Sequence, residues 1–235
     1  MPGEEGLKPF YGIDLGTQYA AIAGVVKPAD KNLESISFHK IRALLQYPGD
    51  WSGSSLSAPF SIYFPLDRSA PLFGYEVDAC LSKENHEIHW NGHRYFRNIK
   101  MLLYRPEDGH QSKLQAHAEH SIRALWGCDL RQGTLELYSL YIEWLLRRAK
   151  ADIGREVKPE VKPGFVLTMP DGWGFDVADV FVLAAEIAVK KAWPYYKAGE
   201  AVDIFTVSEP DAQATYTLAS AGPYSNHTLD MRYVR

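Results

Sequence analysis

The chain has little cysteine and no long apolar run, and both absences exclude classes of protein. Its 235 residues include only two cysteines, Cys80 and Cys128. These two lack metal-ligand spacing and are too few for a disulfide-rich secreted scaffold, so we expect reduced thiols. The start, Met1 to Pro9, lacks the basic and apolar segments of a signal peptide, and no later stretch could span a bilayer. The sequence therefore predicts a cytoplasmic protein, with a nuclear location as the alternative, and no membrane partner.

The chain also lacks an excess of charge of either sign. Its 25 Lys plus Arg stand against 29 Asp plus Glu, for a net charge of −4, which gives no general attraction to nucleic acid. Hydrophobic residues make up 46% and charged residues 23%, which is ordinary for a globular protein of one large or two small domains. A Walker loop, a dinucleotide-binding fingerprint and a Ser-His-Asp order are all absent from the sequence.

Hydrophobic periodicity predicts alternating helices and strands in the second half of the chain. Apolar residues recur at helical spacing in two long segments, and short apolar runs separate them. Helices are predicted at 135–153, 175–192 and 210–221, and strands at 164–169 and 202–208. This alternation favours an α/β fold with a mixed sheet flanked by helices.

The first half predicts strands that precede this α/β region. Their apolar residues are separated by Gly, Pro and Ser, which mark turns and loops. Strands are predicted at 10–14, 20–26 and 33–41, with an edge strand at 58–64. Residues 84–130 show no sustained period, and we predict no element there.

One short motif combines a strand with a turn that could hold phosphate. The apolar strand from Tyr11 delivers Asp14 at its end, and the Gly16-Thr17 turn follows. Glycine allows close approach of the backbone to an anion, and threonine offers a hydroxyl and an N–H donor. Beside a bound nucleotide, the Asp14 carboxylate would orient water around Mg²⁺. The alternative is an ordinary hairpin in which these residues satisfy turn geometry.

Three later segments strengthen this interpretation because they follow in a characteristic order. They are 98–105, 164–170 and 207–214. Together with Ile13-Asp14-Leu15-Gly16-Thr17, they resemble the actin, sugar-kinase and heat-shock-chaperone ATPase superfamily, and most closely the seventy-kilodalton heat-shock chaperones. Gly172-Trp173 after Pro170 resembles their divergent eukaryotic branch. The resemblance runs through roughly residues 9–221 as a series of motifs with dissimilar sequence between them.

The resemblance implies a ribonuclease H-like, actin-type ATPase lobe that binds ATP and Mg²⁺. It places Lys100 at the terminal phosphate and makes Glu209 a partner of Asp14 in holding Mg²⁺ through water. It interprets Thr168-Met169-Pro170 as structural. The phosphate cradle would consist of Gly16, Thr17, Gln18 and Tyr19, with Gln18 where the family has a second hydroxyl. As alternatives, Lys100 would be a surface lysine and Glu209 an acid at a helix start.

The family's second phosphate loop, adenosine-binding segment and peptide-binding domain have no counterpart in the sequence. We therefore expect a flexible start (1–8), a first lobe (9–222) with a less regular insert (84–130), and an irregular tail (223–235), with the second lobe absent. Such a chain would bind ATP but hydrolyse it weakly or not at all alone. The resemblance also implies unfolded peptides and co-chaperones as partners.

Two other functions stay open. The chain could be a non-catalytic scaffold that self-associates through the face left exposed by the missing lobe. It could also be half of a small-molecule kinase of the same superfamily, although Glu209-Pro210 and the Lys100 segment favour the chaperone branch.

Overall fold

A computed structural model describes most of the chain. The described residues are 6–29, 40–50, 55–67, 69–83, 94–104, 111–171 and 173–214, without the side chain of Phe175. The strands are β1 (Leu7–Leu15), β2 (Tyr19–Pro28), β3 (Arg42–Ala43), β4 (Ala58–Pro59), β5 (Ser61–Tyr63), β6 (Leu72–Phe73), β7 (Tyr95–Arg97), β8 (Gly164–Met169) and β9 (Ile204–Ser208). The helices are α1 (Tyr75–Lys83), the 3₁₀ helix η3 (Ile99–Leu102), α3 (Lys113–Trp126), α4 (Leu130–Asp152) and α5 (Phe175–Ala192).

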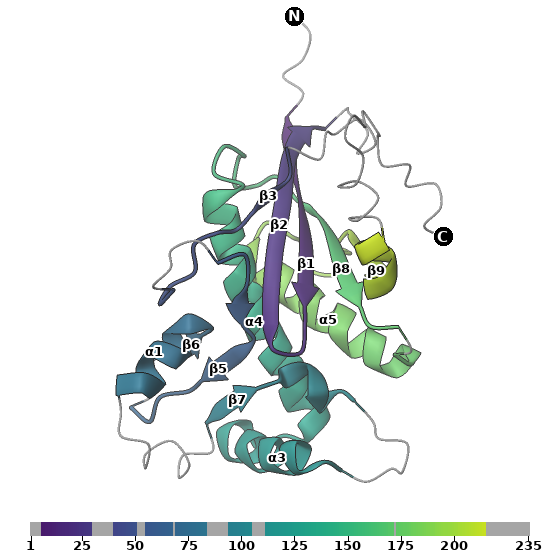
Figure 1. The fold of residues 1–235 in the computed structure, drawn as a ribbon. Coiled ribbons are helices and arrows are strands. Elements are labelled where there is room, and N and C mark those ends of the chain that lie inside the picture. Colours follow the sequence, from purple (N-terminus) through teal and green to yellow (C-terminus); the bar gives the residue numbers. More distant parts are fainter. Residues whose placement is uncertain are drawn as a thin grey trace, which may run out of the picture.

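A mixed sheet of six strands forms the centre of the molecule (Figure 1). Five strands follow the order β3-β2-β1-β8-β9, and β4 pairs with the start of β2. β1 is antiparallel to β2 and parallel to β8, β8 is parallel to β9, and β3 is antiparallel to β2. Strands β1, β3, β8 and β9 therefore share one direction, and β2 runs against them.

The alternation of side chains along β1 separates a core face from an accessible face. Tyr11, Ile13 and Leu15 are almost fully buried, whereas Gly12 and Asp14 between them are exposed. Because successive side chains of a strand point to opposite faces, Asp14 lies on the face away from the core.

Helices α4 and α5 cover the core face (Figure 1). α4 begins where the Asp129 side chain accepts a hydrogen bond from the backbone N–H of Gln132 at 2.8 Å, a standard N-cap. Tyr138, Tyr141 and Leu145 are completely buried at helical spacing and place the apolar side of α4 in the core. The side of α5 in the core is rich in alanine, at 184, 185, 188 and 192, so the two helices can approach closely.

A second, smaller sheet of order β6-β5-β7 lies beside α4, together with α1 and α3 (Figure 1). α3 begins with a capping box in which Ser112 and Gln115 bond reciprocally to each other's backbone N–H. It crosses α4 where Gly133 faces Ile122: a Cβ on Gly133 would lie 2.2 Å from Ile122 Cγ2. The glycine is therefore required by the close crossing of the two helices.

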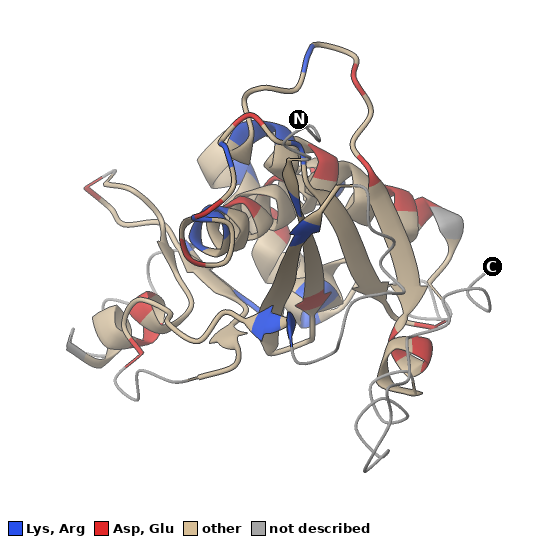
Figure 2. Cartoon of the chain, turned by 90° about the horizontal axis from the view of Figure 1, so that it is seen from above, with Lys and Arg blue, Asp and Glu red and all other residues tan. Residues whose placement is uncertain are grey.

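Charged residues of both signs are interspersed over the helices. Three pairs at i,i+4 join Glu119 to Arg123, Glu143 to Arg147 and Glu186 to Lys190. Figure 2 shows blue and red residues mixed over the strands and helices in this view. No helix among the described residues is both long and apolar enough to cross a membrane.

The α/β class with a mixed sheet flanked by helices is confirmed, and the strands predicted at 10–14, 20–26, 164–169 and 202–208 are β1, β2, β8 and β9. The helix predicted at 135–153 begins earlier, at Leu130. The strand predicted at 58–64 is interrupted at Phe60, because β4 pairs with β2 whereas β5 pairs with β6 and β7.

Other predictions meet the limits of the described residues. Of the predicted strand at 33–41, only residues 40 and 41 are described, and they are not in a strand. The predicted helix at 210–221 begins at 209 and is described to 214. Most of the predicted flexible start and all of the tail at 223–235 lie outside the described residues. Within 84–130, where no element is predicted, the structure has β7, η3, α3 and the start of α4.

Candidate functional site

The register of the parallel strands brings three segments to one edge of the sheet. Ile13 pairs with Leu167, and Thr168 pairs with Val207. Neighbouring strands lie about 4.8 Å apart, so the ends of β1 and β9 are separated by roughly 10 Å, with β8 between them. Groups at the carboxyl ends of parallel strands are well placed to form a ligand site.

Asp14 and Thr168 meet directly at this edge. The Thr168 hydroxyl donates a hydrogen bond to Asp14 Oδ1, across 154 residues of sequence. This bond orients the Asp14 carboxylate while the side chain stays exposed. The interpretation of Thr168 as purely structural therefore missed a contact to the predicted acid.

The turn that follows Asp14 has a tight geometry of its own. The N–H of Gly16 donates to the carbonyl of Tyr19 at 2.9 Å, and a Cβ on Gly16 would lie 2.8 Å from that oxygen. The carbonyl of Gln18 accepts from the N–H of Phe60 at 2.7 Å, which ties the turn to the segment between β4 and β5. Glycine is thus required by the hairpin itself, and its N–H is already engaged. Thr17, Gln18 and Tyr19 are exposed beside Asp14.

The structure brings Lys100 and Glu209 together. Lys100 Nζ forms an ion pair with Glu209 Oε1, although 109 residues separate the two. The Lys100 side chain is only 10% exposed and that of Glu209 is 38% exposed, so the pair lies at the boundary between core and solvent. Lys100 Nζ also lies 5.7 Å from the centroid of the Trp173 ring, a cation–π distance. Lys100 is therefore not the surface lysine of the alternative interpretation.

A side chain of α3 binds the backbone near Lys100. The buried amide of Gln115 donates to the carbonyl oxygens of Leu102, at 3.2 Å, and Tyr104, at 2.6 Å. Asn98 starts the 3₁₀ turn in a left-handed conformation, with φ of 51°. These contacts fix the short helix that presents Lys100.

The predicted residues form two separate pairs rather than one connected cluster. Asp14 pairs with Thr168, and Lys100 pairs with Glu209. Among the described residues no group of three His, Cys, Asp or Glu side chains could bind a metal directly. Asp14 lies in β1 and Glu209 directly follows β9, two strands away, and both carry carboxylate oxygens, the donor type that Mg²⁺ accepts, directly or through water.

Sequence reasoning also missed Trp173. Its ring makes an edge-to-face contact with Phe181 at 5.8 Å and also lies against Lys100. A scan against protein-family models and a search of curated proteins found no match to this chain.

Proposed function

We propose that this chain is the first lobe of an actin-type, heat-shock-chaperone-like ATPase and that it binds Mg-ATP at the carboxyl edge of β1, β8 and β9. The observation that carries the proposal is the pairing of Lys100 with Glu209. Both residues were selected from motif order alone, and they meet at this edge. The strand order β3-β2-β1-β8-β9 is compatible with the ribonuclease H-like lobe that the resemblance implies.

In this proposal each residue has a chemical role. Asp14, oriented by Thr168, and Glu209 would hold water around Mg²⁺. Lys100 would leave Glu209 or share it with the metal and would stabilise negative charge on the terminal phosphate. The exposed N–H groups and the hydroxyl of the turn at Thr17 would contact phosphate oxygens. The chain lacks the motifs of a second lobe, so we expect binding with weak or no turnover.

The first test is titration calorimetry of the chain with ATP and Mg²⁺. We expect Mg-dependent heat in the wild type, its loss in Asp14→Asn, and at least tenfold weaker binding in Lys100→Met. Lys113→Met is the matched control because this lysine lies exposed at the start of α3. Absence of heat in the wild-type protein, or equal loss in Lys113→Met, would contradict the proposal.

The second candidate is a non-catalytic scaffold that self-associates. The observation in its favour is Phe205, which lies in β9 beside the site and is 60% exposed. Sedimentation velocity separates the two functions: a scaffold predicts concentration-dependent dimers that Phe205→Ser weakens and that Mg-ATP leaves unchanged. Binding of peptide clients and of co-chaperones would be tested by titrating the chain with an unfolded peptide or with a co-chaperone, with and without Mg-ATP.

A further inference from the structure

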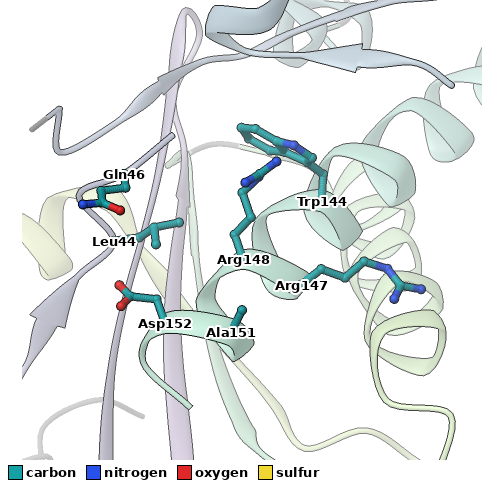
Figure 3. Close-up of a pocket in the computed structure, with 7 residues that line it drawn as sticks. All are labelled: Leu44, Gln46, Trp144, Arg147, Arg148, Ala151 and Asp152. Carbon is teal, nitrogen blue, oxygen red and sulfur yellow. The ribbon is translucent and has the colours of Figure 1, made fainter. Parts of the chain in front are cut away.

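A cavity of about 500 Å³ lies on the β3 side of the central sheet. The proposed nucleotide site on β1, β8 and β9 begins two strands further along that sheet. Leu44 and Gln46, which follow β3, form one wall, and the C-terminal half of α4 forms the other with Trp144, Arg148 and Asp152 (Figure 3). Its volume is in the range of pockets that bind small molecules.

Arg148 is the most unusual side chain of this cavity. Its guanidinium carbon lies 5.2 Å from the centroid of the Trp144 ring, and Figure 3 shows the side chain turned toward that ring. Within the part of the chain that the structure describes, Arg148 Nε and Trp144 Nε1 are buried without a hydrogen-bond partner, whereas Arg148 as a whole is half-buried and lines the cavity. Burial lowers the pKa of Arg148, an effect that the nearby Glu76 partly opposes. Buried donors without acceptors are rare in folded proteins, and each needs an explanation.

The neighbouring arginine shows what a structural role on this helix requires. Arg147 donates from Nε to Glu143 Oε1 at 2.8 Å and from Nη2 to the carbonyl of Lys191 at 3.1 Å. In Figure 3 it extends away from Arg148, toward the side of α4 that faces α5. A rotation of about 100° per helical residue separates the two side chains. Arg147 also lines the cavity, but its hydrogen bonds to Glu143 and Lys191 tie it to α4 and α5.

We propose that this cavity binds a small organic monocarboxylate through Arg148. A carboxylate fits the donor fork of arginine and would accept hydrogen bonds from the Arg148 guanidinium, which lines the cavity. Leu44 and Ala151 would contact the apolar body of the ligand, and the amide of Gln46 lies on the opposite wall. Asp152 on the same wall as Arg148 carries a negative charge, so the cavity disfavours a phosphate dianion relative to a singly charged carboxylate.

The test is a titration followed by the indole N–H resonances of the chain, with hexanoate, hexanol and inorganic phosphate as probes. The Trp144 resonance is assigned by its absence in Trp144→Phe. We expect hexanoate to shift this resonance saturably, hexanol and phosphate to leave it unchanged, and Arg148→Lys to weaken binding tenfold or more. Arg123→Lys is the control expected to retain binding, because Arg123 is exposed on α3 and does not line the cavity.

Several outcomes would overturn the proposal. They are no saturable shift with hexanoate, an equal response to hexanol or phosphate, and equal weakening by Arg123→Lys and Arg148→Lys. If Arg148→Lys does not fold, as judged by circular dichroism, Asp152→Asn provides the second variant. Removing that negative charge is expected to strengthen hexanoate binding about threefold, and unchanged or weaker binding would refute the assignment.

Discussion

The crossing of α3 and α4 supports a quantitative prediction for Gly133→Ala. A Cβ at this position would lie 2.2 Å from Ile122 Cγ2 and 2.7 Å from both Cγ1 and Cδ1. Carbon atoms in contact normally lie about 3.5–4.0 Å apart, so the fully buried Ile122 would have to move by more than about 1 Å. Overpacking of this kind costs about 1–3 kcal/mol, whereas the helix preference for alanine over glycine returns about 1 kcal/mol. With three atoms in conflict, we expect a net loss of about 1–2 kcal/mol.

Urea unfolding followed by circular dichroism measures this loss, and a double-mutant cycle tests its cause. Ile122→Ala alone creates a cavity and should cost about 2–4 kcal/mol. In the double variant the new methyl group occupies part of that cavity, so the two changes together should cost at least about 1 kcal/mol less than their sum. The reasoning is refuted if Gly133→Ala stabilises the protein or if the two effects are additive.

Three further predictions concern other contacts. Gln115→Ala removes two hydrogen bonds to backbone carbonyls and half of the capping box, so thermal unfolding should show a loss of about 1–3 kcal/mol, against almost none for the exposed Gln111→Ala. Burial raises the pKa of Tyr47 to about 12, from 10.0 in the unfolded chain. The unfolded state therefore loses this proton first, and the free energy of unfolding should fall as the pH rises from 10 to 12. The fall should be steeper in the wild type than in Tyr47→Phe, by about 1 kcal/mol per pH unit. The same pH dependence in both proteins would contradict this assignment. Thr168→Val removes the hydrogen-bond donor to the exposed Asp14, so the free energy of unfolding should change by less than about 0.5 kcal/mol. Mg-ATP binding measured by calorimetry should weaken. Unchanged binding would remove Thr168 from the proposed site.

The strands of the central sheet could be predicted from sequence because each carries a strong local pattern. β1 alternates buried and exposed residues, and β8 is an apolar run bounded by Pro163 and Pro170. The order of motifs assigned Lys100 to the terminal phosphate and Glu209 to Mg²⁺ at one site. It did not predict their ion pair, and no periodicity links residues 109 positions apart.

Helix α3 in the region 84–130 was not predicted because the side that it buries consists mostly of small or polar residues, although these recur at helical spacing. α3 buries only a few residues, among them Ala118, Ser121 and Ile122, and several of its other positions are polar. The available signal was the capping box, Ser112 followed three residues later by Gln115, which is a recognised helix start. The contact of Trp173 with Lys100 had no local signal at all, because it depends on tertiary packing.

The parallel pairing of β1 with β8 has a consequence for biosynthesis. Asp14 leaves the ribosome long before Thr168, its hydrogen-bonding partner 154 residues later. At roughly 5–20 residues per second, the interval is about 8–30 s. During that time the first hairpin of the nascent chain has no strand on one side, and its free edge is open to pairing with other chains. Co-translational assistance at this stage would therefore protect the hairpin until β8 has been made.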